Sequence, residues 1–275
     1  MEPTFIDERR ADPRSTEELI TLALAAPDEE AEWKLLAVLH ARGNREVLDA
    51  AGSLCTNFVA KERQLGAEIL GQLGAPGSTY PEERFQLLAT MLQHETDPDV
   101  LASIAVAFGH LEDPRCVRLL IPLKAHPNAG VRYSVVHGIS GQDDPEAIET
   151  LIELSRDDDG NTRAWATFSL ATFTEADSPA IREALLARVS DPKADARGEA
   201  LVGLARRRDP AVIELLLKEL TSASVGVEIL EAAEELGDPK LLPALMQLKE
   251  RYRSDASSNA ALLSKAIARC CGISD

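Results

Sequence analysis

Residues 97–114 read DPDVLASIAVAFGHLEDP and contain one complete helical element with a boundary on each side. Asp97 and Asp113 each precede a proline. An Asp at the N-cap followed by Pro favours the start of a helix. The carboxylate accepts a hydrogen bond from a backbone amide that would otherwise be unpaired in the first turn, and proline has no amide hydrogen that would need a partner there. The apolar positions between the two starts are Val100, Ile104 and Phe108. A spacing of four residues marks one face of an α-helix and not a strand, so the stretch predicts a helix that ends near residue 110.

The same signals recur along the chain. A capping residue precedes proline at Asp113-Pro114, Asp144-Pro145, Ser178-Pro179, Asp209-Pro210 and Asp238-Pro239, in steps of 31, 34, 31 and 29 residues. The apolar stripe recurs as Val131, Val135 and Ile139, as Thr162, Ala166 and Leu170, as Ala196, Ala200 and Leu204, and as Val225, Ile229 and Ala233. A period of about 30 residues that holds two helices predicts a stack of helical hairpins.

About eight hairpins fit this period. First helices are expected near 16–26, 44–57, 81–94, 114–125, 144–156, 178–190, 209–220 and 239–252. Second helices are expected near 29–42, 59–74, 97–110, 128–140, 160–173, 193–206, 223–236 and 256–271. The loop between Gly74 and Tyr80 is the longest internal break. The fold class is therefore predicted to be all-α.

The chain resembles HEAT repeats, especially the short bacterial form that is also found in phycobilisome-lyase-like proteins. The resemblance is carried by the Asp-turn-Val-Arg helix starts, by the second helices rich in Ala, Leu and Gly, and by the junctions at 108–114 and 235–239. It implies an α-solenoid that forms a right-handed superhelical arc. We expect one solenoid over 16–275, preceded by a loose acidic N-terminal tail over 1–15.

The resemblance also implies which surface binds a partner. In HEAT proteins the first helix of each pair lies on the convex side and the second lines the concave side. The residues expected in the centre of the concave groove are Val106, Tyr133, His137, Trp165 and Phe168. Towards the C-terminus the same face is expected to be acidic through Glu228, Glu231 and Glu234. The alternatives are that the rings fill gaps between second helices and that the acids form a solvated face.

Basic residues follow the first stripe position of five second helices. They are Lys34, Arg63, Arg132, Arg163 and Arg197. Such a ladder suits binding of phosphate or carboxylate ligands. The resemblance implies instead a structural role, in which the Arg pairs with an Asp of a neighbouring turn, bidentately where the geometry allows.

Charge and composition exclude several classes of protein. The chain of 275 residues carries 29 Lys and Arg against 46 Asp and Glu, a net charge of −17. Phosphate neutralisation needs clustered cations, so neither a nucleic acid nor a membrane surface is an expected partner. The four cysteines form no CxxC pair, the N-terminus has no apolar run, and no apolar stretch reaches 18 residues. We therefore expect reduced thiols, no membrane span and a cytoplasmic location.

No pattern of catalytic residues is visible. The chain has no HExxH, no Gly-rich phosphate loop and no GxSxG, and its run of acids at 157–159 does not match a calcium loop. The di-iron HEAT enzyme deoxyhypusine hydroxylase uses several His-Glu pairs, whereas His94-Glu95 is the only such pair in this sequence. We expect no catalytic residues, no cofactor and no metal.

The function predicted from the sequence is a non-enzymatic scaffold or adaptor. It would bind another protein, of basic character, through its concave face, because the acidic surface attracts a basic partner. One specific form is an inhibitor or immunity-type protein that neutralises a basic toxin or nuclease. The alternative is a phycobilin-lyase-like protein that acts on a tetrapyrrole-carrying protein. The oligomeric state is left open.

Overall fold

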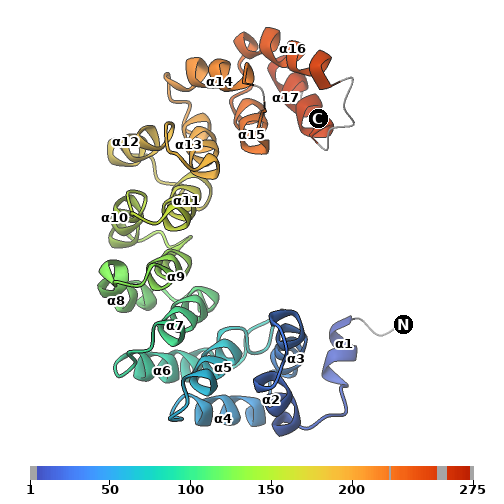
Figure 1. The fold of residues 1–275 in the computed structure, drawn as a ribbon, viewed down its shortest axis with the longest axis vertical. Helices are drawn as coiled ribbons and strands as arrows, with labels where there is room; N and C mark the ends of the chain where they lie inside the picture. The colour runs from blue at the N-terminus through green and yellow to red at the C-terminus, as the bar shows by residue number, and fades with distance from the viewer. Residues whose placement is uncertain (1–4, 223, 253–258, 273–275) are drawn as a thin grey trace. The chain divides into compact units, whose positions relative to one another are not determined.

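The computed structural model describes residues 5–222, 224–252 and 259–272, and all regular structure in these ranges is helical. The chain divides into two compact units, Met1–Ile139 and Ser140–Asp275. Figure 1 shows the order of the helices along the chain. The predicted succession of helical hairpins is confirmed, and so is the all-α fold class.

The first unit runs from α1 to α9. Its helices are α1 (Phe5–Arg10), α2 (Thr16–Leu24), α3 (Glu29–Arg42), α4 (Arg45–Leu54), α5 (Ala60–Gly71), α6 (Pro81–Leu92), α7 (Pro98–Leu111), α8 (Arg115–Leu120) and α9 (Ala129–Ile139). A 3₁₀ turn (Ile121–Ala125) extends α8. It replaces the last turns of the α-helix expected there, because Pro122 has no amide hydrogen to continue the α-helical ladder.

The second unit runs from α10 to α17. Its helices are α10 (Pro145–Leu154), α11 (Gly160–Phe168), α12 (Pro179–Arg188), α13 (Ala194–Arg206), α14 (Val212–Leu220), α15 (Val227–Leu236), α16 (Leu242–Tyr252) and α17 (Ala260–Cys270). A π-helical turn (Ser169–Phe173) ends α11, and a 3₁₀ turn (Pro239–Leu241) precedes α16. The start of the last expected helix, at 256–258, lies outside the described residues.

The predicted caps begin several of these helices. Asp97 accepts hydrogen bonds from the backbone N–H groups of Asp99 (3.0 Å) and Val100 (3.3 Å). Asp144, Ser178 and Asp238 cap α10, α12 and the 3₁₀ turn before α16 in the same manner. Each cap satisfies an amide that the first turn of a helix leaves unpaired.

Within each unit the helices form two layers. The first helices form one layer and the second helices pack in sequence on one another in the other, α5 on α7 and α7 on α9, then α11 on α13 and α13 on α15 (Figure 1). The predicted stripe is the core between the layers, since Val100, Ile104 and Phe108 are fully buried. We call the outward side of the second-helix layer the second-helix face.

Within the segment expected to be a loose tail, residues 5–14 make defined contacts with α3. Helix α1 packs on α3, and Arg10 Nε donates to the backbone oxygen of Ala41 at 2.9 Å. Arg42 also donates to the backbone oxygens of Asp12 and Arg14. The charges of this segment are mainly acidic, but its Arg10 bonds to a carbonyl at the carboxyl end of α3, where carbonyls lack partners.

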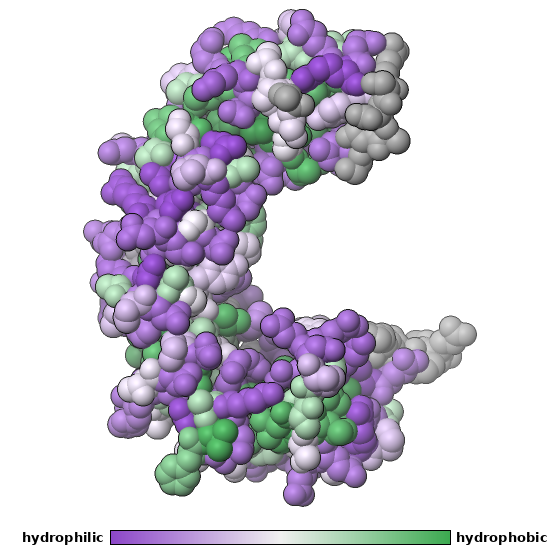
Figure 2. All heavy atoms as spheres, in the orientation of Figure 1, coloured by the Kyte–Doolittle hydropathy of each residue, from purple (hydrophilic) through white to green (hydrophobic). Residues whose placement is uncertain are grey.

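The visible face of each unit is mainly hydrophilic. On the face shown in Figure 2, purple side chains predominate over both units, and green hydrophobic ones gather in patches that include the α2–α4 end of the first unit. Exposed apolar side chains of this region include Leu22, Trp33 and Phe58. Among the described residues, no helix combines the length and the apolar character that crossing a bilayer requires.

Candidate functional site

Arg163 and Arg63 of the basic ladder have the structural role that the resemblance implied, whereas Lys34 forms an exposed pair with Glu30 of its own helix. Arg163 of α11 pairs bidentately with Asp191, from Nε to Oδ2 at 2.9 Å and from Nη2 to Oδ1 at 3.1 Å. Asp191 follows α12 and is 4% exposed, so the pair links two consecutive hairpins out of solvent. Arg163 is therefore engaged within the protein and is not arranged for an external anion.

Arg63 makes the equivalent pair in the first unit, but with Glu95. Its Nε and Nη2 donate to the two carboxylate oxygens at 2.7 and 3.0 Å. Glu95 also accepts from the backbone N–H groups of Thr96 and Asp97. The glutamate of the His94-Glu95 pair thus organises a turn.

The second-helix face of the first unit contains a cavity of about 570 Å³, which we call the α3–α7 cavity. Side chains of α3, α5 and α7 line it, with Ser134 of α9 at its edge. The lining includes three carboxylates, two rings and one apolar side chain: Glu29, Glu32, Glu68, Trp33, His110 and Val106. Val106, predicted for the groove, lies in this cavity, whereas Tyr133 and His137 are not among its lining residues.

Burial controls the protonation of the cavity's polar groups. Burial raises the pKa of Glu68, whose carboxylate is held by Gln64 Nε2 (2.9 Å) and Ser103 Oγ (3.1 Å). Burial lowers the pKa of His40 to about 4, and its neutral ring bonds to the backbone oxygen of Glu68 at 3.0 Å. Burial also lowers the pKa of His110, so both histidines are neutral at pH 7.

Tyr133 and His137 lie one turn apart on α9. Their rings meet edge to face with centroids 4.9 Å apart, and both side chains are half-buried. They form a ring pair at the surface of the first unit, not part of its fully buried core. Their role in binding a partner stays a prediction.

In the second unit, Trp165 and Phe168 form a cluster with Phe173. The ring centroids of Trp165 and Phe168 are 5.0 Å apart, as are those of Phe168 and Phe173. The first two rings are half-buried and Phe173 is 46% exposed, because the π-helical turn carries it outward. Whether these rings receive a tetrapyrrole, as the lyase-like alternative requires, stays a prediction.

The acids predicted at the C-terminal end lie on α15, beside Glu199 of α13. Burial raises the pKa of Glu199 to about 7, with the charges of Glu228 and Glu231 adding to the shift. The two helices approach closely here, because a Cβ on Gly198 would lie 2.6 Å from the Cβ of Glu228. Glu234 is half-buried on the next turn. We call Glu199, Glu228, Glu231 and Glu234 the α13–α15 acidic face.

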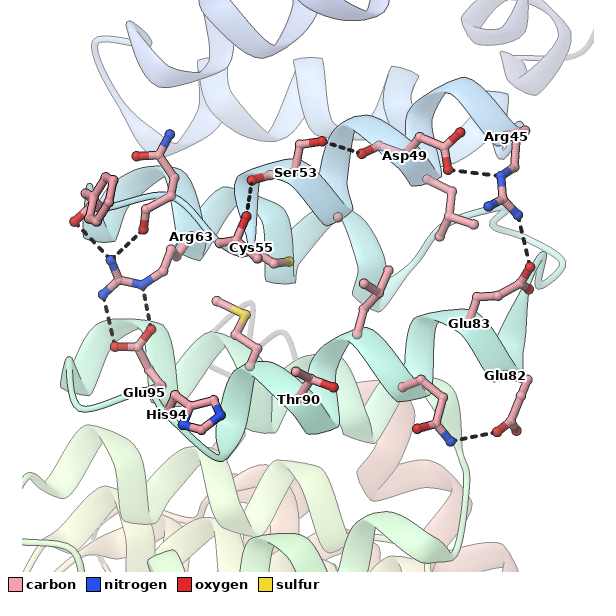
Figure 3. A pocket seen from close by; sticks show the side chains of 18 of the residues that line it. Arg45, Asp49, Ser53, Cys55, Arg63, Glu82, Glu83, Thr90, His94 and Glu95 are labelled. Carbon is pink, nitrogen blue, oxygen red and sulfur yellow. Dashed lines mark hydrogen bonds and ion pairs between the residues drawn. The ribbon is translucent and has the colours of Figure 1, made fainter.

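A larger groove of about 1160 Å³ lies between α4 and α6 and was not predicted from the sequence. Figure 3 shows the pair of Arg45 and Glu83 (3.0 Å) at one end and the pair of Arg63 and Glu95 at the other. Phe58, in the turn beside the second pair, is fully exposed. The resemblance places this layer on the convex side, and among the residues around the groove only Phe58, an apolar residue in a turn, is a sequence signal for a surface there.

Cys55, Cys116 and Cys270 are buried and suited to packing, whereas Cys271 is exposed. Burial raises the pKa of Cys55 and of Cys116 to about 12, so both are thiols at pH 7. Within the described ranges, no three His, Cys, Asp or Glu side chains are grouped as ligands of a metal ion.

Comparison with known proteins identifies the class. A model of HEAT repeats matches residues 85–171 and 154–236, and the chain belongs to this family. The sequence is 29% identical over 214 residues to Protein YibA of Escherichia coli strain K12, covering 76% of each chain.

Solved structures share the fold. The crystal structure of Escherichia coli YibA superimposes with a TM-score of 0.74 at 24% identity, over 98% of this chain and 97% of the other. The karyopherin Kap121p, bound to the extreme C-terminus of the phosphatase Cdc14p, matches with a TM-score of 0.63 at 15% identity. That match covers 94% of this chain and 34% of Kap121p.

Proposed function

We propose that this HEAT-repeat protein is a non-enzymatic scaffold that binds a basic protein through its second-helix face. HEAT repeats form surfaces for protein interaction, and Kap121p binds a protein terminus on the same fold. The proposal includes the narrower form in which the partner is a basic toxin or nuclease that this protein inhibits.

The observation that carries the proposal is the α13–α15 acidic face. Burial raises the pKa of Glu199, and the charges of Glu228 and Glu231 lie close enough to raise it further. Arg206 and Asp195 also face Glu199, and Arg206 lies 3.7 Å from Glu235. Like charges held together cost stability, and a cationic partner would relieve that cost.

The test is titration of the full chain with a 20-residue poly-L-lysine. We expect the double variant Glu228→Gln/Glu231→Gln to weaken binding about tenfold at low salt, because two charges facing the cation are lost. The matched control is Glu149→Gln/Glu214→Gln, which removes the same charge from exposed sites on the first helices α10 and α14.

Proton release gives a second measurement. Glu199 is partly protonated at pH 7, so an approaching cation should lower its pKa and release a proton to the buffer. Calorimetry in buffers of different ionisation enthalpy measures this release. Equal loss of affinity in the two double variants, with no proton release, would show that the binding is not localised to this face.

A further inference from the structure

The α3–α7 cavity contains carboxylates that its own lining does not balance. Glu29, Glu32 and Glu68 line it, and the lining includes no lysine or arginine. Its two histidines are neutral at pH 7 for the reasons given above. The cavity is thus a half-enclosed space whose charges are all negative.

Glu68 is the carboxylate that most needs an explanation. Glu29 and Glu32 lie in the first turn of α3, where acids complement the helix dipole, but Glu68 lies in the body of α5. Both of its neutral donors, Gln64 Nε2 and Ser103 Oγ, bond to Oε1. Within the described residues, the second carboxylate oxygen, Oε2, accepts no hydrogen bond. It is also not one of the unpaired polar atoms that are buried, so it remains accessible to solvent. The charge of Lys61 acts on Glu68 from outside the cavity lining, and its effect is smaller than that of burial, which raises the pKa of Glu68. A half-buried carboxylate with one open oxygen and no cation hydrogen-bonded to it is costly unless a ligand completes it.

Trp33 supplies an aromatic surface in the same cavity. It is 50% exposed, although its ring meets the His40 ring edge to face at 6.0 Å. Its orientation is therefore supported while half of its surface stays accessible. Leu36 and Val106 add apolar wall, which suits the methylene stem of a long side chain.

We propose that the α3–α7 cavity binds an arginine side chain of a protein partner, with the guanidinium against Trp33 and paired with Glu68 Oε2. This inference rests on the proposed function, because it specifies how a basic partner is recognised. A guanidinium stacks on an indole and is more weakly hydrated than an ammonium, so it loses less on entering a half-buried site. The cavity volume of about 570 Å³ leaves room for the backbone beside the arginine.

The experiment compares three peptides of equal length on the full chain: hexa-arginine, hexa-lysine and hexa-citrulline. Citrulline keeps the planar shape of arginine and lacks its charge. The chain has two tryptophans, so Trp165→Phe leaves Trp33 as the reporting indole. We expect hexa-arginine to change the Trp33 emission, hexa-lysine to bind several-fold more weakly, and hexa-citrulline to have no effect.

Two variants test the named contacts. Trp33→Ala and Glu68→Gln should each weaken hexa-arginine binding about tenfold, measured by calorimetry on the otherwise unmodified chain. Glu68→Gln keeps the shape and an acceptor oxygen, and circular dichroism checks the fold. Phe58→Ala is the matched control, because it removes a fully exposed ring of the same unit outside the cavity.

The outcomes separate this inference from the proposed function. If Trp33→Ala and Glu68→Gln bind hexa-arginine as the unmodified chain does, the cavity assignment is wrong, whatever the α13–α15 acidic face does. If these variants lose binding while Glu228→Gln/Glu231→Gln keeps it, the cavity assignment stands and the acidic face fails. Equal affinity for hexa-arginine and hexa-lysine would overturn the preference for arginine.

Discussion

Four arginines of the ladder fix the turn that precedes their own helix. Each donates from Nη1 to the carbonyls six and five residues earlier: Arg63 to Asn57 and Phe58, Arg132 to His126 and Pro127, Arg163 to Asp157 and Asp158, and Arg197 to Asp191 and Pro192. One arginine thus closes the turn before its own helix. For Arg63 and Arg163 the same side chain also pairs with a carboxylate of the next hairpin, Glu95 or Asp191. This double use explains why arginine and not lysine occupies these positions, since a lysine offers no planar fork.

Asp191 tests this role. It accepts from Arg163, from Arg188 Nη1 (3.1 Å) and from the backbone N–H of Lys193 (2.9 Å). We expect Asp191→Asn to lower the free energy of unfolding by about 3 kcal/mol, because two half-buried guanidinium groups lose the buried carboxylate that balances them. Urea unfolding followed by circular dichroism measures the change. The control, Asp49→Asn, breaks an exposed pair with Arg45 and should cost below about 0.5 kcal/mol.

The pairing of Arg163 with an aspartate could be predicted from the resemblance, whereas the role of Arg84 could not. Arg84 follows two glutamates in the first turn of α6 and reads as a surface residue, yet it is 1% exposed. Its guanidinium donates to the backbone oxygens of Leu70, Gly71 and Leu73, which closes the end of α5. An acidic side chain that pairs with an arginine can be predicted from its residue type. A backbone carbonyl cannot, because every residue has one.

At the scale of helices, small residues set the spacing of the second-helix layer. A Cβ on Gly138 of α9 would lie 2.7 Å from the backbone oxygen of Ala105 on α7. A Cβ on Gly109 would lie 2.8 Å from the backbone oxygen of His137. The close contact between α7 and α9 therefore depends on glycine, which accounts for the Ala- and Gly-rich composition of the second helices.

Gly138→Ala should separate α7 from α9. The added methyl has to displace backbone, so we expect a loss of about 2 kcal/mol in unfolding free energy, despite the better helix propensity of alanine. Gly160→Ala is the control, because its nearest neighbour would be a flexible lysine carbon at 3.5 Å. A Gly138→Ala protein as stable as the control would show that the two helices adjust without cost.

The positions of the helices were predictable, and the hollows between them were not. Caps and stripes are local, so α7 and α10 begin within a residue or two of their predicted starts. The α4–α6 groove and the α3–α7 cavity depend on the sizes of side chains from hairpins about 30 residues apart. Of the predicted groove residues, Val106 lies in such a hollow because it extends from α7 towards α3 and α5.

For the whole molecule, the net charge of −17 makes pH a strong variable. His40 and Glu199 act in opposite directions. The pKa of His40 falls from 6.5 to about 4 on folding, so the unfolded chain binds more protons between these values and stability rises with pH up to about 6.5. The pKa of Glu199 rises from 4.5 to about 7, so the folded chain binds more protons and stability falls as pH increases through 7.

Glu199→Gln separates these effects. From pH 6.5 to 8 most other carboxylates are already ionised, and the remaining protonation of His40 in the unfolded chain makes stability rise with pH. A loss of stability with rising pH in this range therefore reports Glu199. We expect the variant to match the unmodified chain at pH 4.5 and to exceed it by about 2 kcal/mol at pH 8, because its amide carries no charge to desolvate or repel. Urea unfolding at both pH values measures this, with Glu214→Gln, at an exposed site on α14, as the control. A stability gain in the control of similar size would assign the effect to net charge, and an unchanged Glu199→Gln profile would mean that Glu199 is already well solvated when ionised.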